Sequence, residues 1–262
     1  MTFPNPLPRS LSPSRLADFQ SCPRRFQHAS IDRIPQPATY ATVKGNFVHS
    51  ILEHLFSLPA LERTIEAARG FIPLAREEKL TEQAKVDIDF SPDLEAKLLS
   101  ETEAILVKYF AMEDPRIVTS EGVELNIDVT VDDVPLRGIL DRLDREEDGS
   151  LTIVDYKTGG LPNRDFDAQT FANTELYAAL TAAALEETPV RIRLYYVAHG
   201  QVIERTVSDV VIAARRKAAV GAWKRINDYY EQGEFPATPS RSSCRFCAYK
   251  EICKKNGVPV PA

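Results

Sequence analysis

The sequence lacks any long run of apolar residues, although hydrophobic residues make up 44% of its 262 positions. A membrane-spanning helix needs about 20 consecutive apolar residues, so we expect no such span. The amino-terminal stretch from Met1 to Pro8 contains neither the basic nor the apolar region of a secretory signal. The sequence therefore predicts a globular protein of the cytoplasm without a membrane partner.

A phosphate-binding glycine-rich loop is also missing. No segment matches the pattern Gly-x4-Gly-Lys-Ser/Thr, with which many ATPases hold nucleotide phosphates. A helicase activity would therefore require a separate chain. The length suits one large domain or two small ones, and neither an internal repeat nor a low-complexity tract divides the chain.

Cysteine is scarce, and its four positions are uneven. Cys22 stands alone, whereas Cys244, Cys247 and Cys253 form a C-x2-C-x5-C group near the end. In a reducing compartment such a group is more often a metal or cluster site than a disulfide framework. Four thiolates can hold a tetrahedral Zn²⁺ or a [4Fe-4S] cluster, and this spacing hardly separates the two. Four unrelated cysteines are the third alternative.

Positive charge is concentrated at the two ends of the sequence, although the net charge is −6. Residues 1–50 carry six basic side chains against two acidic ones, and residues 241–255 carry five against one. A centre shared by the cysteines would bring these two segments together. The resulting basic patch would suit phosphates. Without such a centre, they would be two separate solvated segments.

The central part of the chain predicts a β-hairpin. Residues 138–144 and 151–157 are rich in apolar and β-branched side chains, and the Asp148-Gly149 pair between them is a strong turn signal. Asp155 and Lys157 are two residues apart, so both should point to one face of the sheet. The turn would place Asp141 opposite residue 155 or 156.

Two close carboxylates beside a lysine indicate a specific chemistry. Asp141 and Asp155 would repel each other unless a cation lay between them, and Mg²⁺ or Mn²⁺ prefers such oxygen ligands. A bound cation acidifies its water, and Lys157 could orient or deprotonate that water. The pattern predicts hydrolysis of a phosphodiester. The alternative is an ordinary exposed hairpin with surface ion pairs.

The remaining pattern predicts an α/β (α+β) fold with a mixed sheet flanked by helices. Helices are expected from Pro13 to the Cys22-Pro23 pair, over 42–56, over most of 60–112, and over 168–187 and 209–230; strands are expected over 123–131, 134–145, 150–157, 190–197 and 202–207. A strand, a helix and a strand in that order suggest a crossover. Residues 60–112 carry no chemical motif and are expected to form a helical insertion.

A histidine on the second predicted helix could reach the hairpin. His49 lies one turn after Gly45, and a glycine there leaves room for a close neighbour. A lone helical histidine is more often structural or exposed, so the helix alone does not assign it as a ligand.

Taken in order, these motifs resemble the RecB-like branch of the PD-(D/E)xK nucleases, in the subgroup with an iron-sulfur cluster. This subgroup includes the nuclease domains of AddB-type helicase-nucleases and the small nucleases of CRISPR adaptation. The resemblance rests on Leu11 to Phe26, Gly45 to His49, Gly138 to Arg142, Asp155 to Lys157 and the last three cysteines. It implies a single restriction-endonuclease-like domain over residues 1–262.

The resemblance also implies roles for individual residues. A Mg²⁺ or Mn²⁺ ion would be bound by His49, Asp141, Asp155 and the main-chain carbonyl of Tyr156, with Lys157 assisting the attacking water. A [4Fe-4S] cluster at Cys22, Cys244, Cys247 and Cys253 would join segments 1–30 and 241–255. Tyr177 would serve the catalytic site, but Asn173 stands four residues before it where the family usually has glutamine. Glu124 resembles the family's acidic position on the preceding strand.

The implied function is a metal-dependent DNA exonuclease acting on single strands or DNA ends, in repair and recombination or in CRISPR-type processing. One alternative is an iron-sulfur module that binds DNA for a helicase-nuclease complex without cutting it. Another is a zinc-stabilised DNA-binding protein of the same fold.

Overall fold

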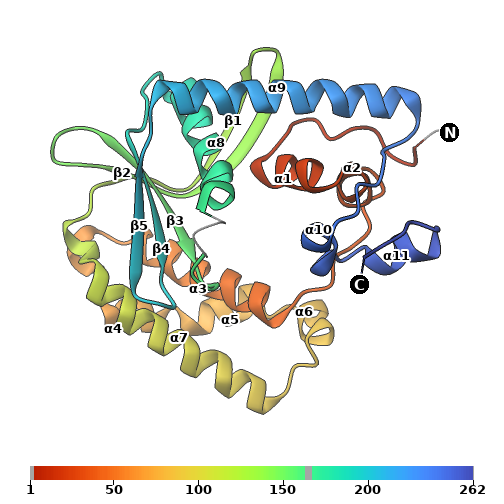
Figure 1. Cartoon of the computed structure of the whole chain (residues 1–262). Coiled ribbons are helices and arrows are strands. Elements are labelled where there is room, and N and C mark those ends of the chain that lie inside the picture. Colours follow the sequence, from red (N-terminus) through yellow and green to blue (C-terminus); the bar gives the residue numbers. More distant parts are fainter. Residues whose placement is uncertain (1–2, 163–166, 262) are drawn as a thin grey trace.

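The computed structural model describes residues 3–162 and 167–261. A five-stranded sheet lies at its centre, in the order β1-β2-β3-β4-β5 (Figure 1). The strands are β1 (Ser120–Val131), β2 (Val134–Arg145), β3 (Leu151–Lys157), β4 (Arg191–Tyr196) and β5 (Gln201–Thr206). The first three form an antiparallel meander, β3 and β4 are parallel, and β5 returns antiparallel to β4. The predicted mixed sheet is confirmed.

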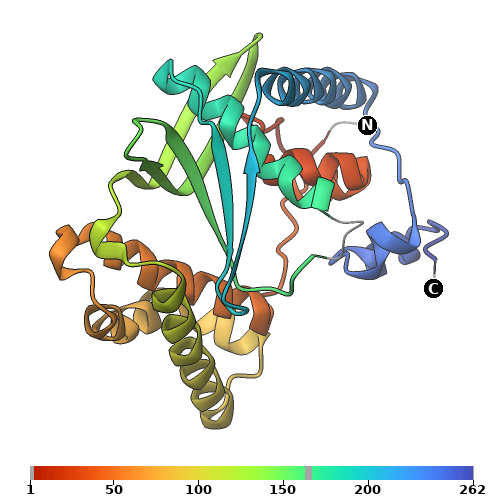
Figure 2. The same ribbon diagram turned by 60° about the vertical axis from the view of Figure 1, so that its left-hand side comes forward.

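Helices pack on both faces of this sheet, as Figures 1 and 2 show. The longer helices are α1 (Pro13–Ser21), α3 (Tyr40–Ser57), α7 (Pro92–Met112), α8 (Asp167–Leu185) and α9 (Asp209–Gln232). The shorter ones are α2 (Pro23–Phe26), α4 (Ile65–Gly70), α5 (Ile72–Lys79), α6 (Glu82–Asp87), α10 (Arg241–Arg245) and α11 (Lys250–Lys255), with single turns η1 (Gln27–Ile31), η2 (Ala60–Glu62) and η3 (Pro115–Ile117). The α8 helix makes the crossover that the parallel pair β3 and β4 requires.

The buried side chains form two clusters, one on each side of the sheet. Helices α1, α8 and α9 belong to the first cluster, together with Ile153 of β3. Helices α3, α4, α5 and α7 belong to the second, together with Val154 and Tyr156 of the same strand. Because successive strand residues point to opposite faces, a strand buried on both sides becomes almost continuously apolar. This explains the apolar run of β3.

Local capping signals fix where the helices begin. Ser12 caps α1, with its hydroxyl accepting from the Arg15 N–H, and Pro13 occupies the first helical position, as predicted. Thr39 and Thr42 form a reciprocal cap on α3, so this helix begins two residues before the expected Thr42. The apolar side chains spaced four apart along α3 form a buried stripe of Val43, Phe47, Ile51 and Leu55. Each such side chain contributes about 1.5–3 kcal/mol through burial.

The two ends of the chain lie side by side. The Arg24 side chain donates to the Phe235 carbonyl at 2.7 Å, and the Thr238 N–H approaches the Cys22 sulfur at 3.4 Å. Figure 2 shows α10 and α11 beside the amino-terminal helices. Cys22 and Arg25 also line a cavity together with Cys244, Cys247 and Cys253, so the two basic segments lie close to each other. Within residues 3–162 and 167–261, no helix is both long and apolar enough to cross a membrane.

Candidate active site

The β2–β3 hairpin brings the two predicted acids to one level of the sheet. Arg145 lies opposite Leu151 and Arg142 opposite Val154. Continuing this register by one residue places Asp141 opposite Asp155, which is one of the two positions predicted from the turn. The pairing follows from the hairpin because each step along one antiparallel strand matches one step back along the other.

Side chains along β2 point alternately to the two faces of the sheet, and this alternation breaks at Asp141. Leu140 belongs to the apolar cluster under α8, whereas Arg142, two residues later, points to the other side and packs on the Phe56 ring of α3. Across from Asp141 on β1, Glu124 has a φ of 45°, in the left-handed region that non-glycine residues rarely adopt. Such strained backbone occurs preferentially at functional sites.

His49 reaches the hairpin from α3. Its Nε2 lies 2.9 Å from the Tyr156 carbonyl oxygen, and its Nδ1 lies 3.5 Å from Oδ1 of Asp141. The other Asp141 oxygen accepts from the Tyr156 N–H at 2.7 Å. Gly45 makes this approach possible, because a Cβ there would lie 3.2 Å from the Thr158 hydroxyl. The predicted closeness of this glycine to a neighbour is confirmed.

Asp155 is largely buried beside Lys157, with 14% of its side chain exposed. The lysine Nζ lies 2.5 Å from Oδ2 of Asp155, so both side chains point to one side of β3, as predicted. This oxygen is fully buried and has no well-directed hydrogen bond from the described part of the chain. Burial and the nearby Asp141 raise the pKa of Asp155, and Lys157 only partly offsets them. The site holds more negative charge than its own residues balance.

The other ionisable groups respond to the same crowding. Burial lowers the pKa of His49, but Asp141 and Asp155 outweigh it, so the net shift is upward. Burial raises the pKa of Asp141, but the contacts with His49 and the Tyr156 N–H outweigh it, so the net shift is downward. Burial lowers the pKa of Lys157, but Asp155 together with Asp141 outweighs it, so the net shift is upward.

These residues fit a small divalent cation. Donor atoms of His49, Glu124 and Asp141 lie within 4.8 Å of one another. His49 Nε2 donates a hydrogen bond to the Tyr156 carbonyl at 2.9 Å, so a cation that replaced this proton would find the nitrogen and the oxygen side by side. The buried Oδ2 of Asp155, whose contact in the described residues is the ion pair with Lys157, is a further oxygen that a cation could bind.

A pocket opens over this group, and some of its walls were not predicted. It is lined by Asn46, His49, Ser50, Glu53, Lys79, Glu124, Ile139 and Asp141. Glu53 follows His49 by one helical turn, so the sequence contained a signal for it. Lys79 belongs to residues 60–112, where we found no chemical motif. Its neighbour Glu78 accepts from Ser50 and lies 3.0 Å from His54, and these contacts attach α5 to α3.

Tyr177 of α8 lies against β2 close to the acids. A Cβ at Gly138 would stand only 2.5 Å from its ring, so glycine is needed for this approach. Burial, then Asp155 and Asp141, raise the pKa of Tyr177 to about 12. Asn173 lies one turn earlier on α8 and is partly exposed.

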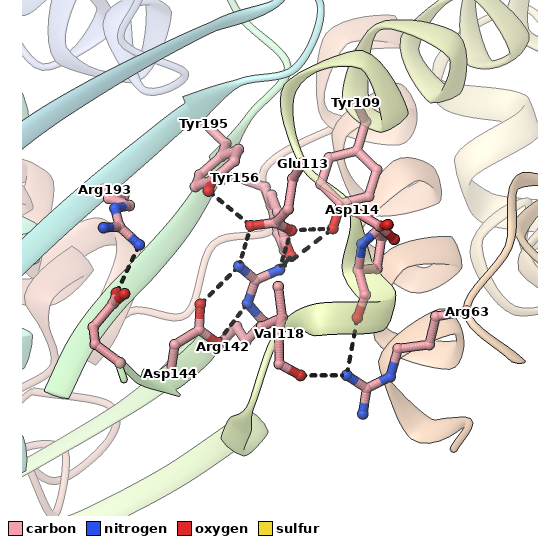
Figure 3. A network of polar contacts seen from close by, with 12 residues as sticks. Arg63, Tyr109, Glu113, Asp114, Val118, Arg142, Asp144, Tyr156, Arg193 and Tyr195 are labelled. Carbon is pink, nitrogen blue, oxygen red and sulfur yellow. Dashed lines mark hydrogen bonds and ion pairs between the residues drawn. The ribbon is translucent and has the colours of Figure 1, made fainter. Parts of the chain in front are cut away.

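A second charged cluster lies behind the hairpin and was not predicted (Figure 3). Arg142 is 0% exposed and makes paired hydrogen bonds to both Asp144 and Glu113. It also donates to the Tyr156 hydroxyl at 2.6 Å, while Tyr195 donates to Glu113 at 2.7 Å. Because Glu113 ends α7, this cluster attaches that helix to β2, β3 and β4.

The four cysteines line one cavity, with Tyr249, His28 and Arg25 among its other walls. All four are partly exposed free thiols. Burial raises the pKa of the Cys253 thiol, and the other three cysteines add to the shift. Within the described residues, no three of these sulfurs lie within 4.8 Å of one another. The structure thus places Cys22 beside the three carboxy-terminal cysteines, as a centre bound by all four cysteines would require.

The whole chain matches one known protein family. The family model described as the PD-(D/E)XK nuclease superfamily matches residues 10–254, which is nearly the full length. The chain belongs to the PD-(D/E)XK nuclease superfamily. The resemblance drawn from the motifs is thereby confirmed at the level of the superfamily. His49, Asp141, Asp155, Lys157 and Tyr177 all lie inside the matched range, and so do the four cysteines.

This PD-(D/E)XK protein is similar to one subunit of an ATP-dependent helicase/deoxyribonuclease from Streptococcus agalactiae, with 26% identity over 177 residues. The match covers 65% of the chain but only 16% of that relative. It is also similar to the Gene 69 protein of Mycobacterium phage D29, with 22% identity, covering 92% of the chain and 95% of the phage protein.

A solved structure supports the fold. The crystal structure of an exonuclease candidate from Eubacterium rectale superposes with a TM-score of 0.57, covering 95% of the chain and 88% of the other protein. The identity is 15%, so this similarity concerns the fold alone. It agrees with a mixed sheet flanked by helices.

Proposed function

We propose that this chain is a metal-dependent DNA nuclease that hydrolyses phosphodiester bonds as an exonuclease, on single strands or at DNA ends. The observation that carries the proposal is the buried pair Asp141 and Asp155 at one level of the hairpin, with His49 and Lys157 against it. The family membership supports the same chemistry. The excess negative charge of the pair is what a divalent cation and its phosphate substrate require.

Each residue would have a distinct task. His49, Asp141, Asp155 and the Tyr156 carbonyl would hold Mg²⁺ or Mn²⁺, with Glu124 close by. The ion would supply an acidified water and stabilise negative charge on the phosphate. Lys157 Nζ would orient the attacking water, and the Tyr177 hydroxyl would contact the DNA strand beside it. His49 must be neutral to serve as a ligand, so binding would displace its proton.

The test is degradation of end-labelled single-stranded DNA with Mn²⁺ or Mg²⁺, by protein purified without oxygen. We expect the wild type to cut, Lys157→Ala to lose cleavage, and Lys217→Ala to behave as wild type, because Lys217 is exposed on α9. The position of the label gives the polarity. Absence of cleavage with either metal would favour the alternative of a non-cleaving DNA-binding module.

We further propose that Cys22, Cys244, Cys247 and Cys253 hold a [4Fe-4S] cluster that joins residues 1–30 to residues 241–255. The common cavity supports this proposal. A zinc ion with Zn–S bonds of about 2.3 Å would hold its sulfurs about 3.8 Å apart.

Colour and metal content distinguish the alternatives for this cavity. Anaerobically purified protein should be brown, with broad visible absorbance and about four irons per chain. The Cys253→Ser variant should lose both the absorbance and the ordered carboxy-terminal segment. A colourless preparation containing one zinc per chain would favour the zinc-stabilised alternative instead.

The biological setting is part of the same proposal. We infer that the chain works in the cytoplasm on DNA, in repair and recombination or in CRISPR-type processing, with residues 1–262 as one nuclease domain and 60–112 as its helical insertion. The similarity to a helicase/deoxyribonuclease subunit supports a separate helicase partner. Co-purification with such a chain from its own cells would test this partner.

A further inference from the structure

The amino-terminal segment lies along the edge of β2 close to the candidate metal site. The Leu11 N–H donates to the Pro135 carbonyl at 2.8 Å, and the Arg137 N–H donates to the Leu11 carbonyl at 3.1 Å. These bonds hold the start of α1 against the same strand that carries Asp141. Basic side chains of the amino-terminal segment are therefore brought beside the sheet.

Arg15 and Arg137 lie where these segments meet, and Arg33 is a further exposed arginine of the amino-terminal segment. The Arg15 side chain donates to the Ser10 carbonyl at 2.8 Å, directly before Leu11, and the Arg137 side chain donates to Asn126 at 3.2 Å. Burial lowers the pKa of Arg15, and the charges of Arg137 and then Arg33 lower it further, so the three guanidinium groups feel one another.

These arginines have no acidic partner among the residues that the structure describes. By contrast, several other arginines are paired with an acid, as Arg216 is with Asp132 and Arg116 with Asp114. Bringing like charges together without a counter-charge costs free energy, and guanidinium groups bind phosphates with particular strength. The arrangement is thus suited to an external anion.

Their position connects them with the catalytic pocket. Arg137, Ile139 and Asp141 are alternate residues of β2, and four residues of strand span about 13 Å. Ile139 is 44% exposed and lines the pocket together with Asp141. An exposed path therefore leads from the candidate metal site over an apolar side chain to the arginines.

We propose that Arg15, Arg33 and Arg137 bind the phosphodiester backbone of the DNA strand whose scissile phosphate lies at Asp141 and Asp155. Ile139 contacts the nucleotide between the two places. This inference rests on the proposed nuclease function and adds to it a binding site outside the metal centre. The proposed site implies that the DNA strand runs across β2 from the catalytic pocket towards α1.

The test measures binding without cutting. The parent is Asp155→Ala, and the probe is a fluorescent single-stranded 12-mer DNA, with anisotropy recorded from low to high salt. In this background, the double variant Arg15→Gln and Arg137→Gln should raise Kd about 10-fold or more. The slope of log Kd against log salt concentration should fall by about 1.4, because two phosphate contacts are lost and each contributes about 0.7. The control Arg116→Gln with Arg216→Gln removes the same charge elsewhere and should change Kd less than 2-fold.

The outcomes separate the two proposals. A parent that binds DNA while the Arg15 and Arg137 double variant matches it in Kd and slope would overturn the arginine site alone. A parent that binds no DNA would overturn the nuclease function and this site with it. Arg33→Gln serves if the double variant fails to fold, because its side chain is exposed; it should lower the slope by about 0.7.

Discussion

Two charged clusters share the β2–β3 hairpin, and they differ in how completely their charges are balanced. Behind the hairpin, Arg142 satisfies Glu113 and Asp144 with paired hydrogen bonds, and the hydroxyls of Tyr109, Tyr156 and Tyr195 complete the cluster. In the pocket, Asp155 keeps a buried oxygen without a well-directed hydrogen bond from the described residues, beside a second acid. A satisfied buried cluster stabilises one structure, whereas an unsatisfied one is ready for a ligand.

The comparison predicts opposite consequences for the two clusters, and the largest is on catalysis. Asp155→Asn should reduce DNA cleavage by about 1000-fold, because the metal would lose a ligand at the scissile phosphate. The melting temperature should stay equal or rise, because the raised pKa of Asp155 shows that its charge is disfavoured in the folded protein. Kinetics and thermal unfolding would measure both. A variant that cuts normally would contradict the assignment.

The matching change in the satisfied cluster should act on stability first. Arg142→Met leaves the Glu113 and Asp144 carboxylates without their cationic partner, so the free energy of unfolding should fall by about 3–5 kcal/mol. Arg216→Met is the control, since its pair with Asp132 lies at the surface and should matter by less than about 1 kcal/mol. Denaturant titration compares them. Equal losses in the two variants would remove the distinction between the clusters.

A smaller effect should connect the clusters through Tyr156. Its hydroxyl bonds Arg142, whereas its carbonyl faces His49, so the satisfied cluster positions a candidate metal ligand. Tyr156→Phe and Tyr195→Phe should each cost about 1 kcal/mol of stability, since each removes one hydroxyl from the network. Only Tyr156→Phe should weaken Mn²⁺ binding, by roughly threefold. Calorimetric titration with Mn²⁺ would show whether the two variants differ.

The smallest expected effect is on the acid stability of the protein. Burial raises the pKa of Glu113, but Arg142 and the hydroxyls outweigh it, so the folded value lies below the ordinary one. Its contribution is therefore complete above the unfolded pKa of about 4.5 and is lost as the pH falls through the folded value. Between pH 6 and pH 4, the free energy of unfolding should fall less in Glu113→Gln than in the wild-type protein. An unchanged drop would mean that other groups dominate.

The fold could be predicted well where local chemistry decides it. The Ser12-Pro13 cap, the apolar stripe of α3 and the Asp148-Gly149 turn all act over a few residues, so their elements appeared where expected. Boundaries moved by a few residues where a side chain acted as cap, as Thr39 did for α3.

The candidate site was predictable to the extent that its residues lie on the hairpin or follow a helical period. Asp141, Asp155 and Lys157 follow from the register of one turn. His49 required the resemblance to a family, because a single helical histidine carries no signal about the sheet that it will meet. The sequence contained no signal for Lys79 or for the partners of Arg142, because these residues come from separate helices and strands.

The sequence by itself thus determined the acids, the lysine, the cysteine positions and the order of strands and helices, because hairpin register and helical periodicity depend on near neighbours. Only the tertiary structure decided which distant groups meet: His49 with the Tyr156 carbonyl, Cys22 with the last three cysteines, and the Leu11 backbone with Pro135 and Arg137 of β2. These contacts depend on how helices pack against the sheet, and the free energy of that packing is distributed over the whole core.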